Sequence, residues 1–234
     1  MKKLGIIGAM DVEVATLKEK MHDKTVRKIA GSEYCEGTLE GLDVVVVQCG
    51  VGKVNAALCA QILCDCFQVT HIVNTGIAGS LNAQLDIGDF VISREAVYHD
   101  MDATNFGYPM CQVPGMAVRA FPADDALMDM AFQVAEKAHP GHVRVGTVAT
   151  GDQFVASKNV KSRIVENTDA LCTEMEGAAI AHAAWKNAVP FVIIRAISDK
   201  ADDSAHMDYP TFEAQAAQRC AQVTQQLAKS LVAL

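Results

Sequence analysis

Runs of β-forming residues alternate with helix-length segments along this 234-residue chain. Such alternation predicts an α/β protein with a mostly parallel sheet and helices on both faces. Residues 34–39 and 44–48 are separated by a short turn and predict a hairpin, so the sheet is expected to be mixed. The predicted strands are residues 4–7, 44–48, 72–73, 90–92, 143–149 and 191–194, and the predicted helices are residues 12–21, 54–66, 124–139, 177–187 and 209–234.

The composition predicts one domain with a large core. Half of the residues are hydrophobic and no Pro/Gly/Ser-rich stretch divides the chain, so residues 1–234 are expected to form a single domain. A net charge of -8 argues against a nucleic-acid partner, which would require clustered Lys and Arg. No apolar run approaches the roughly 20 residues that cross a bilayer. The run at residues 4–10 fits a buried strand better than a signal peptide, so a soluble, cytoplasmic protein is expected.

The eight cysteines and seven histidines predict neither a metal site nor a disulfide framework. The sequence has no C-x-x-C pair, no H-E-x-x-H motif and no His/Asp/Glu cluster at ligand spacing. Most cysteines lie in apolar segments, where a thiol behaves as a small hydrophobe. We therefore expect reduced cysteines, no metal and no cofactor.

Three glycine-rich junctions follow predicted strands. Residues 5–8 (GIIG) lack the G-x-G-x-x-G spacing, and residues 50–54 (GVGKV) lack the first glycine and the Ser/Thr of a Walker loop, so neither predicts a nucleotide-phosphate site. Residues 74–80 (NTGIAGS) follow the strand that ends at Val73 and would let the backbone approach a ligand closely. An ordinary turn from strand to loop is the alternative.

Carboxylates stand at the ends of two successive predicted strands. Glu174 and Glu176 precede the helix at residues 177–187, and Asp199 follows the apolar run at residues 191–194. Polar residues after a buried strand emerge at the carboxyl edge of the sheet, where α/β sheets bind ligands. A carboxylate at this edge can hold ribose hydroxyls, and an aspartate can donate a proton. Together they suit the cleavage of a glycosidic bond. The alternatives are a helix cap for Asp199 and an exposed side chain for Glu174, which is left outside the catalytic set.

Six segments together resemble the bacterial 5′-methylthioadenosine/S-adenosylhomocysteine nucleosidases, within the wider family of purine nucleoside phosphorylase-like proteins. They occur in order over nearly the whole chain. The resemblance implies a three-layer sandwich, a homodimer, and hydrolysis of 5′-methylthioadenosine and S-adenosylhomocysteine to adenine and the 5′-substituted ribose, with 5′-deoxyadenosine as a further candidate substrate. The segments are residues 5–10 (GIIGAM) with Glu13, 50–53 (GVGK), 74–79 (NTGIAG), 151–154 (GDQF), 174–176 (EME) and 195–199 (RAISD).

The resemblance also implies catalytic roles. Asp199 would be the general acid that protonates N7 of adenine, which requires a pKa raised by burial or by hydrogen bonds. Glu13 would position and activate the attacking water, with help from Arg195. Glu176 would hold the ribose hydroxyls while its charge favours the developing cation. For Glu13, the alternative from the residues alone is a solvated glutamate in the first turn of a helix.

The walls of the site follow from the same resemblance. Adenine would stack on Phe154 and bond to the backbone of Val155, while Ser198 supports Asp199. A loop of the neighbouring subunit would complete the 5′ end of the site, with a loop folded onto its own subunit as the alternative. For the apolar positions, ordinary core packing is the alternative. The expected substrate-binding residues are Glu176, Met175, Phe154, Val155, Ser198, Arg195, Met10, Val51, Ile77, Ala78, Gly79, Tyr209 and Phe212, with Phe106, Tyr108 and Pro114 in the loop of the neighbouring subunit.

Three positions depart from the pattern of the family. Ser80 takes the place of the final glycine in the glycine-rich segment. Ile77 stands where the glycine-rich segment commonly carries serine, which removes a hydroxyl that could hold the water. Tyr209 stands where related sequences often carry phenylalanine, which would suit a more polar 5′ substituent.

Three other functions stay open: a phosphorylase on the same fold, a futalosine-type nucleosidase, and a non-catalytic nucleoside-binding relative. A phosphorylase needs arginines for phosphate, yet no Arg precedes Arg27 and Glu13 would repel an anion. A protein that only binds does not need a proton donor, so the presence of Asp199 with Glu13 and Glu176 argues against the third.

Overall fold

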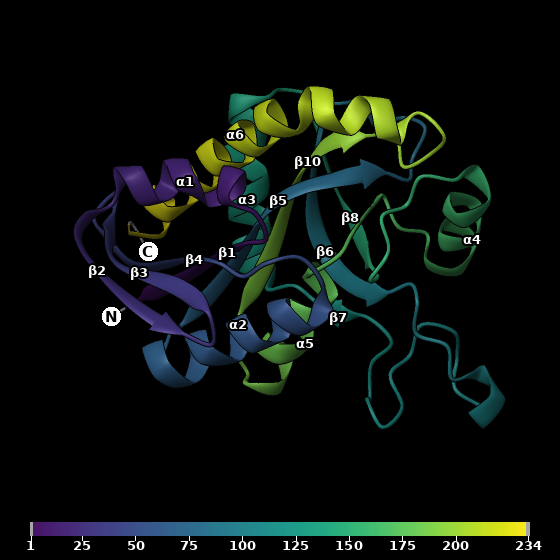
Figure 1. Cartoon of the computed structure of the whole chain (residues 1–234), viewed down its shortest axis with the longest axis horizontal. Coiled ribbons are helices and arrows are strands. Elements are labelled where there is room, and N and C mark those ends of the chain that lie inside the picture. Colours follow the sequence, from purple (N-terminus) through teal and green to yellow (C-terminus); the bar gives the residue numbers. More distant parts are fainter. Residues whose placement is uncertain (1, 233–234) are drawn as a thin grey trace.

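The computed structural model describes residues 2–232 as one mixed sheet with helices on both faces (Figure 1). The strands are β1 Lys3–Gly8, β2 His22–Ile29, β3 Ser32–Leu39, β4 Leu42–Gln48, β5 His71–Ser80, β6 Phe90–Tyr98, β7 Phe121–Pro122, β8 Val143–Thr150, β9 Cys172–Glu174 and β10 Phe191–Asp199. The helices are α1 Asp11–Lys20, α2 Lys53–Phe67, α3 Asp125–Ala138, α4 Lys158–Thr168, α5 Gly177–Lys186 and α6 Ala205–Val232, with a 3-10 turn η1 at Thr104–Phe106.

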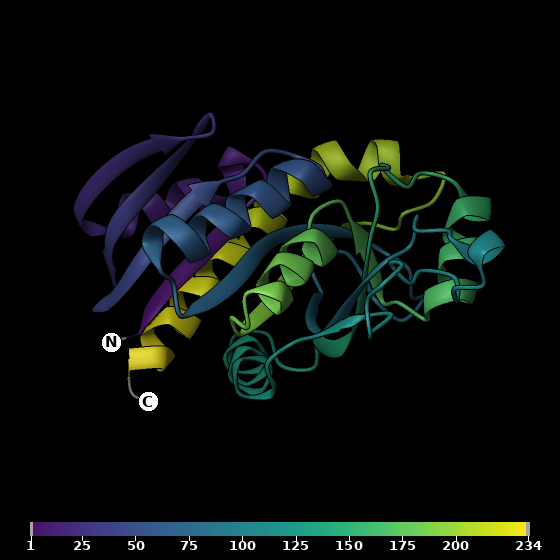
Figure 2. The same ribbon diagram turned by 90° about the horizontal axis from the view of Figure 1, so that it is seen from below.

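Part of the sheet closes on itself. β5 pairs with β10, β10 with β6, β6 with β8, β8 with β9, and β9 with the end of β5. From β5 the sheet continues outward through β1 and β4 to the antiparallel strands β3 and β2. Helices α1, α3 and α6 cover one face, and α2 and α5 lie side by side on the other (Figures 1 and 2). The carboxyl ends of β1, β5, β9 and β10 are thereby brought together.

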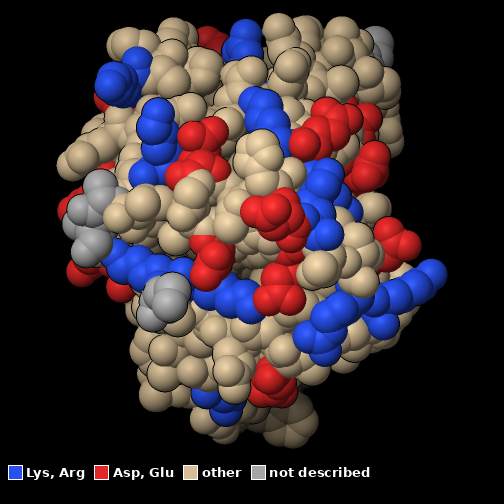
Figure 3. Space-filling view, turned by 90° about the vertical axis from the view of Figure 1, so that its left-hand side faces the viewer, with Lys and Arg blue, Asp and Glu red and all other residues tan. Residues whose placement is uncertain are grey.

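The predicted strands and helices are all present, and the hairpin is formed by β3 and β4. The last two residues of the helix predicted at residues 209–234 lie outside the described residues. Sequence reasoning missed β2, β7, β9 and α4. β2 is exposed along almost its whole length and therefore lacks the apolar alternation of a half-buried strand. Charges of both signs mix on the face that carries β2 and β3 (Figure 3), which protects an edge strand from pairing with other chains.

Three strands, β5, β6 and β10, are much longer than expected, and the extension of β5 changes where the glycine-rich segment lies. Residues 74–80 continue β5 to Ser80, so the alternative of an ordinary turn from strand to loop is wrong. A Cβ on Gly76 would lie 2.4 Å from Oε1 of Glu13, and one on Gly79 would lie 2.8 Å from Oδ1 of Asp199. β10 likewise continues to Asp199. The missing side chains of Gly76 and Gly79 leave room beside β5 for the carboxylates of Glu13 and Asp199.

Within residues 2–232, no helix is both long enough and apolar enough to cross a membrane. Over the same range, no group of three His, Cys, Asp or Glu side chains is placed to hold a metal ion.

Candidate active site

A cavity of about 120 Å³ lies where the carboxyl ends of β1, β5, β9 and β10 meet. The loop before α2, the segment after β8 and the first part of α6 close it. Most of the substrate-binding residues expected from sequence lie around this one space, although they come from distant parts of the chain. Its lining residues are Ala9, Met10, Glu13, Val51, Ile77, Ala78, Gly79, Phe154, Thr173, Glu174, Met175, Glu176, Ser198, Asp199 and Tyr209.

Glu13 is held rigidly between β1 and β5. It is buried, and its Oε2 accepts hydrogen bonds from the backbone N–H groups of Ala9 at 2.6 Å and Met10 at 3.0 Å. Its Oε1 accepts one from the N–H of Ile77 at 3.1 Å. The alternative of a solvated first-turn glutamate is therefore wrong. Burial raises the pKa of Glu13, against the opposing effect of the Arg195 charge and these N–H donors.

Asp199 is the last residue of β10 and is buried beside the cavity. Its Oδ2 accepts a hydrogen bond from the hydroxyl of Ser198 at 2.8 Å, and its Oδ1 accepts one from the N–H of Ala201 at 2.8 Å. Because α6 begins only at Ala205, the helix-cap alternative is wrong. Burial raises the pKa of Asp199, and the two hydrogen bonds oppose this in part. A carboxyl group in this setting can hold a proton nearer to neutral pH than an exposed aspartate can.

Glu176 joins the two sides of the cavity. It is buried immediately before α5, and its Oε1 accepts a hydrogen bond of 2.8 Å from the N–H of Gly52, which precedes α2. Burial, with the nearby charge of Glu174, raises the pKa of Glu176 to about 7. Its side chain lines the cavity, so its oxygens are within reach of a bound ligand.

Arg195 forms a buried ion pair with Glu174, which lines the cavity, and sequence reasoning missed this pair. Nη2 of Arg195 donates to Oε2 of Glu174 and, at 2.5 Å, to Oδ1 of Asn74. Glu174 also accepts hydrogen bonds from the hydroxyl of Thr150 and, at 2.7 Å, from the N–H of Gly177 at the start of α5. The alternative of an exposed Glu174 is therefore wrong. In the sequence, Arg195 directly follows an apolar run that predicts a buried strand. A charged residue is almost never fully buried unless it is paired, so this position could have pointed to an ion pair.

The expected substrate-binding residue Arg195 is not among the described residues that line the cavity of the single chain. It is only 2 % exposed, because residue 195 lies inside the extended β10 and not after its end. Although burial disfavours its charge, the carboxylates of Glu174, Glu13 and Glu176 raise the pKa of Arg195. Its permanent positive charge stabilises three buried carboxylates around one site.

Sulfur and aromatic side chains form the apolar walls. Phe154 lies edge-on to Tyr209, with ring centroids 5.5 Å apart. The hydroxyl of Tyr209 is 3.0 Å from Oε1 of Glu213 and 3.3 Å from Sδ of Met10. The extra phenol is therefore hydrogen-bonded beside the cavity. Thr173 also lines it, and its hydroxyl is buried with no hydrogen-bond partner in the described chain. Nothing in the sequence singled out Thr173.

Two expected wall residues lie elsewhere. Phe212 is almost one turn beyond Tyr209 on α6 and faces a separate cavity over residues 86–88. The side chain of Val155 packs in a small hydrophobic cluster with Leu81 and Val97. In the single chain the side chain of Phe212 therefore lines the separate cavity and not this one, whereas the role expected for Val155 concerns its backbone and not its side chain.

The loop expected to act across a subunit boundary stands clear of the cavity. Phe106 is 83 % exposed at the end of η1, Pro114 is exposed and Tyr108 is partly buried. None of the three lines the cavity of a single chain. Figure 1 shows this loop extending away from the sheet at the lower right.

Comparison with known proteins places the chain in a family. The model of the phosphorylase superfamily matches residues 3–232. A 5′-methylthioadenosine/S-adenosylhomocysteine nucleosidase of Staphylococcus carnosus is 40% identical over 229 residues, which cover 97% of this chain and 100% of that protein. The chain belongs to this nucleosidase family. A nucleosidase of the same name from a Geobacillus strain is 41% identical over 230 residues, covering 98% of this chain and 99% of the relative.

Solved structures of the family share the whole fold. The Neisseria meningitidis nucleosidase in complex with methylthio-immucillin-A has a TM-score of 0.95 and 35% identity, covering 98% of this chain and 100% of that one. A futalosine hydrolase of Helicobacter pylori has a TM-score of 0.93 and 31% identity, covering 98% of each chain. The predicted α/β fold and family are confirmed. Because both enzymes match so closely, the fold does not rank substrates within this nucleosidase family.

Proposed function

We infer that the chain hydrolyses the N-glycosidic bond of 5′-methylthioadenosine and S-adenosylhomocysteine, releasing adenine and the 5′-substituted ribose. The observation that carries the residue roles is the placement of two buried carboxylates on one cavity, Asp199 at the end of β10 and Glu13 at the start of α1. Burial raises the pKa of both, but Glu13 lies beside the charge of Arg195, which favours its ionised form. Such a difference between two acids suits one as proton donor and the other as proton acceptor.

Asp199 gives its proton to N7 of adenine as the bond between C1′ and N9 breaks and its electron pair passes to the base. The leaving group is then neutral adenine, and C1′ gains positive charge. The hydroxyl of Ser198 and the N–H of Ala201 hold the resulting carboxylate in place. Each hydrogen bond also stabilises the ionised product form of the acid.

Glu13 accepts a proton from the water that attacks C1′. Three backbone N–H groups fix its two oxygens, so the base needs no reorganisation during the reaction. Glu176 accepts hydrogen bonds from the ribose hydroxyls, and Arg195 acts from behind by keeping the carboxylates ordered. Ile77 supplies its backbone N–H to Glu13, so the missing serine hydroxyl leaves the base itself supported.

The apolar walls suit the two ends of the nucleoside. Phe154 offers a flat aromatic surface for adenine, and the backbone of Val155 offers its polar groups to the edge of the base. Met175 belongs with the residues around the 5′ substituent. Met10, Val51 and Tyr209 line the remainder, where a thioether substituent would pack against sulfur and aliphatic groups. The reaction requires no cofactor.

Purified protein incubated with 5′-methylthioadenosine should release 5-methylthioribose whether or not phosphate is present. No Arg or Lys is among the described residues that line the cavity, and Nη2 of Arg195 is occupied by Glu174 and Asn74. A phosphate nucleophile would therefore find no cation to hold it. The sugar product is identified by mass spectrometry. A phosphate-dependent sugar 1-phosphate would establish a phosphorylase, and no cleavage at all would favour the non-catalytic alternative.

A homodimer is the second element of the proposal. Val54 and Leu58 on α2 are 70% and 52% exposed, and they continue an apolar surface from Val51, which lines the cavity. A second chain on this surface would cover these side chains and reach the mouth of the site. Phe106, Tyr108 and Pro114 of that chain would then close the 5′ end.

Replacing Tyr108 with alanine should weaken cleavage of substrates with long 5′ groups about tenfold and leave adenosine cleavage nearly unchanged. Only the longer substrates would reach the loop of the second chain, and loss of a buried aromatic contact is worth about 1–2 kcal/mol. The values of kcat/KM for S-adenosylhomocysteine and adenosine test this, with Phe106→Ala as a second loop variant.

Mixed dimers sharpen the test. A heterodimer of Tyr108→Ala with Asp199→Asn would contain one site with both defects and one site with neither. Cleavage of S-adenosylhomocysteine should therefore recover when exchanging chains are mixed. Confirmed heterodimers without recovery would contradict completion of the site across the dimer.

A further inference from the structure

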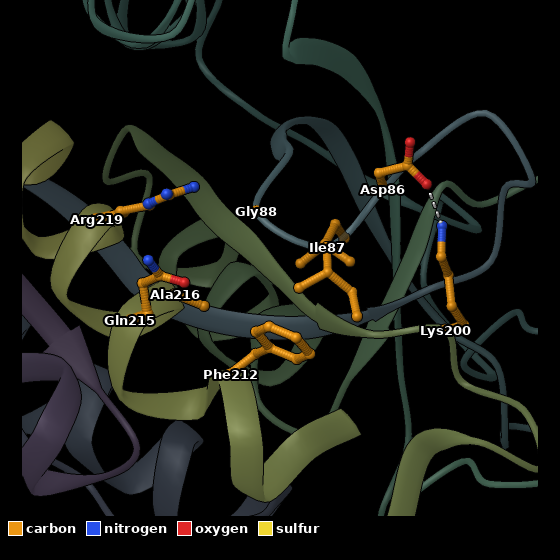
Figure 4. Close-up of a pocket in the computed structure, with 9 residues that line it drawn as sticks. Asp86, Ile87, Gly88, Lys200, Phe212, Gln215, Ala216 and Arg219 are labelled. Atoms are coloured by element: carbon orange, nitrogen blue, oxygen red, sulfur yellow. Dashed lines mark hydrogen bonds and ion pairs between the residues drawn. The ribbon is translucent and has the colours of Figure 1, made fainter. Parts of the chain in front are cut away.

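A second cavity, of about 390 Å³, lies between α6 and the loop that leads into β6 (Figure 4). Ile87, Ile197 and Phe212 give it apolar walls, and its size falls within the range of small-molecule sites. Ile197 immediately precedes Ser198 and Asp199 in β10, so this α6 cavity is separate from the candidate active site but borders the same strand.

The charges around the α6 cavity leave one cation free. The ammonium of Lys200 is paired with Asp86 at 2.7 Å and donates to the carbonyl of Leu85 at 2.5 Å. Arg219, at the opposite end in Figure 4, has no hydrogen bond or ion pair among the described residues. Lys200 and Asp86 cancel, so Arg219 gives the cavity a net positive charge.

The position of the Arg219 guanidinium depends on a glycine. A Cβ on Gly88 would lie 2.7 Å from Nη1 of Arg219, and Gly88 has a φ of +93°, which a side chain would strain. The guanidinium therefore lies directly against the backbone at one end of the cavity. Arg219 is half-buried and lines the same cavity as the apolar side chains of Ile87, Ile197 and Phe212.

We propose that the α6 cavity is a binding site for a small monocarboxylate with an aromatic or aliphatic body. The carboxylate would take the planar donor fork of Arg219 in a bidentate hydrogen bond, and the body would pack against Ile87, Ile197 and Phe212. A phosphate dianion or a nucleotide fits less well, because Lys200 is already neutralised and the whole chain carries a net charge of -8. One free cation matches one negative charge.

The site would be occupied independently of the nucleoside. α6 contributes Tyr209 to the active-site cavity and Phe212 to the α6 cavity, and no residue lines both. A carboxylate bound at Arg219 therefore need not displace a nucleoside held by Asp199 and Glu176. The two ligands would contact the same helix at successive turns.

Phenylacetate is the probe, and phenylacetamide is its neutral match in size and shape. In titrations followed by calorimetry and by NMR, phenylacetate should bind saturably with a Kd in the millimolar range, at least about tenfold more tightly than phenylacetamide, because a hydrogen bond to a charged group is worth more than a neutral one. Saturating the active site with a 5′-methylthioadenosine analogue should leave the Kd for phenylacetate within a factor of about three.

Three variants locate the charge. Arg219→Gln should remove the preference for phenylacetate over phenylacetamide, and Arg219→Lys should keep a preference but a weaker one. Arg27→Gln, on the exposed strand β2 far from the cavity, should change nothing. Circular dichroism and nucleosidase activity confirm that each variant is folded. If Arg219→Gln does not fold, Arg219→Lys and the comparison with phenylacetamide still test whether the charge of Arg219 binds the carboxylate.

Three results would overturn the proposal: no saturable binding of phenylacetate, an equal affinity for the amide, or full competition by the nucleoside analogue. The last would mean that the probe occupies the active-site cavity. None of these binding measurements requires turnover. If the carboxylate site is wrong, phenylacetate binding fails while nucleoside hydrolysis is unaffected; if the proposed function is wrong, hydrolysis fails while phenylacetate binding is unaffected.

Discussion

Asp199→Asn is expected to lower kcat by about 10²–10⁴-fold while nucleoside binding changes only a few-fold, since general acid catalysis typically contributes that factor. The amide keeps the shape of the side chain. Its oxygen can still accept the hydrogen bond from the N–H of Ala201, and its NH2 group can donate to the hydroxyl oxygen of Ser198, but it has no acidic proton for adenine N7. Single-turnover rates and equilibrium binding of 5′-methylthioadenosine measure the two effects separately. Asp203→Asn, an exposed aspartate four residues later, is the matched control and should keep full activity.

The same group predicts a pH dependence. Burial raises the pKa of Asp199, and the reaction needs its protonated form. The rate of cleavage should therefore fall as the pH rises through that raised pKa, and the residual activity of Asp199→Asn should lose this alkaline limb. A variant that keeps more than about half of the wild-type rate would remove Asp199 from the role of acid.

Glu13→Ala is expected to lower kcat by about 10²-fold or more through loss of the base that accepts the proton of water. Alanine is preferable to glutamine here, because the amide nitrogen of Gln would face the N–H donors of Ala9 and Met10, and a buried clash of donors costs about 1–3 kcal/mol on its own. The space left by the carboxylate also permits a direct test. Added formate should restore part of the rate of Glu13→Ala, with saturation, because it can occupy the place of the lost carboxylate.

Two comparisons separate catalysis from folding. Asp11→Asn, in the same first turn of α1 but exposed, should leave both the rate and the thermal unfolding temperature unchanged. If formate gives no recovery in a Glu13→Ala protein that is folded and binds nucleoside, Glu13 supports the structure of the site and is not its base.

The candidate site shows which inferences a sequence supports. The apolar run before Arg195 and the carboxylates flanking two strands placed Glu176 and Asp199 at the edge of a sheet, and the structure brings them to one cavity. Local pattern is sufficient there, because the direction of a buried strand determines where its carboxyl end emerges. For Glu13, the first turn of a helix looks the same in sequence whether it faces solvent or a buried strand. Its burial against β5 depends on which strands are neighbours.

The sequence left the surroundings of Phe212 and Glu174 undecided for related reasons. Tyr209 and Phe212 are three residues apart on one helix, and only the packing of α6 over β10 decides that the first faces the nucleoside cavity and the second the α6 cavity. Glu174 was left as a possible surface residue because its partner Arg195 is 21 positions away along the chain. An ion pair between two buried groups is a property of the folded sheet and has no local spacing.

The sequence by itself determined the α/β class, the order of the main strands and helices, the family and most of the lining of the site, because these depend on hydrophobic period and on motifs that are contiguous in the chain. The tertiary structure alone decided the closed circuit of β5, β10, β6, β8 and β9, the continuation of β5 through its glycines, and the burial of Glu13 and Glu174 around Arg195. Strand pairing, close approach of a carboxylate to Gly76, and desolvation of charge all arise between segments far apart in sequence. These interactions form only after those segments have packed together.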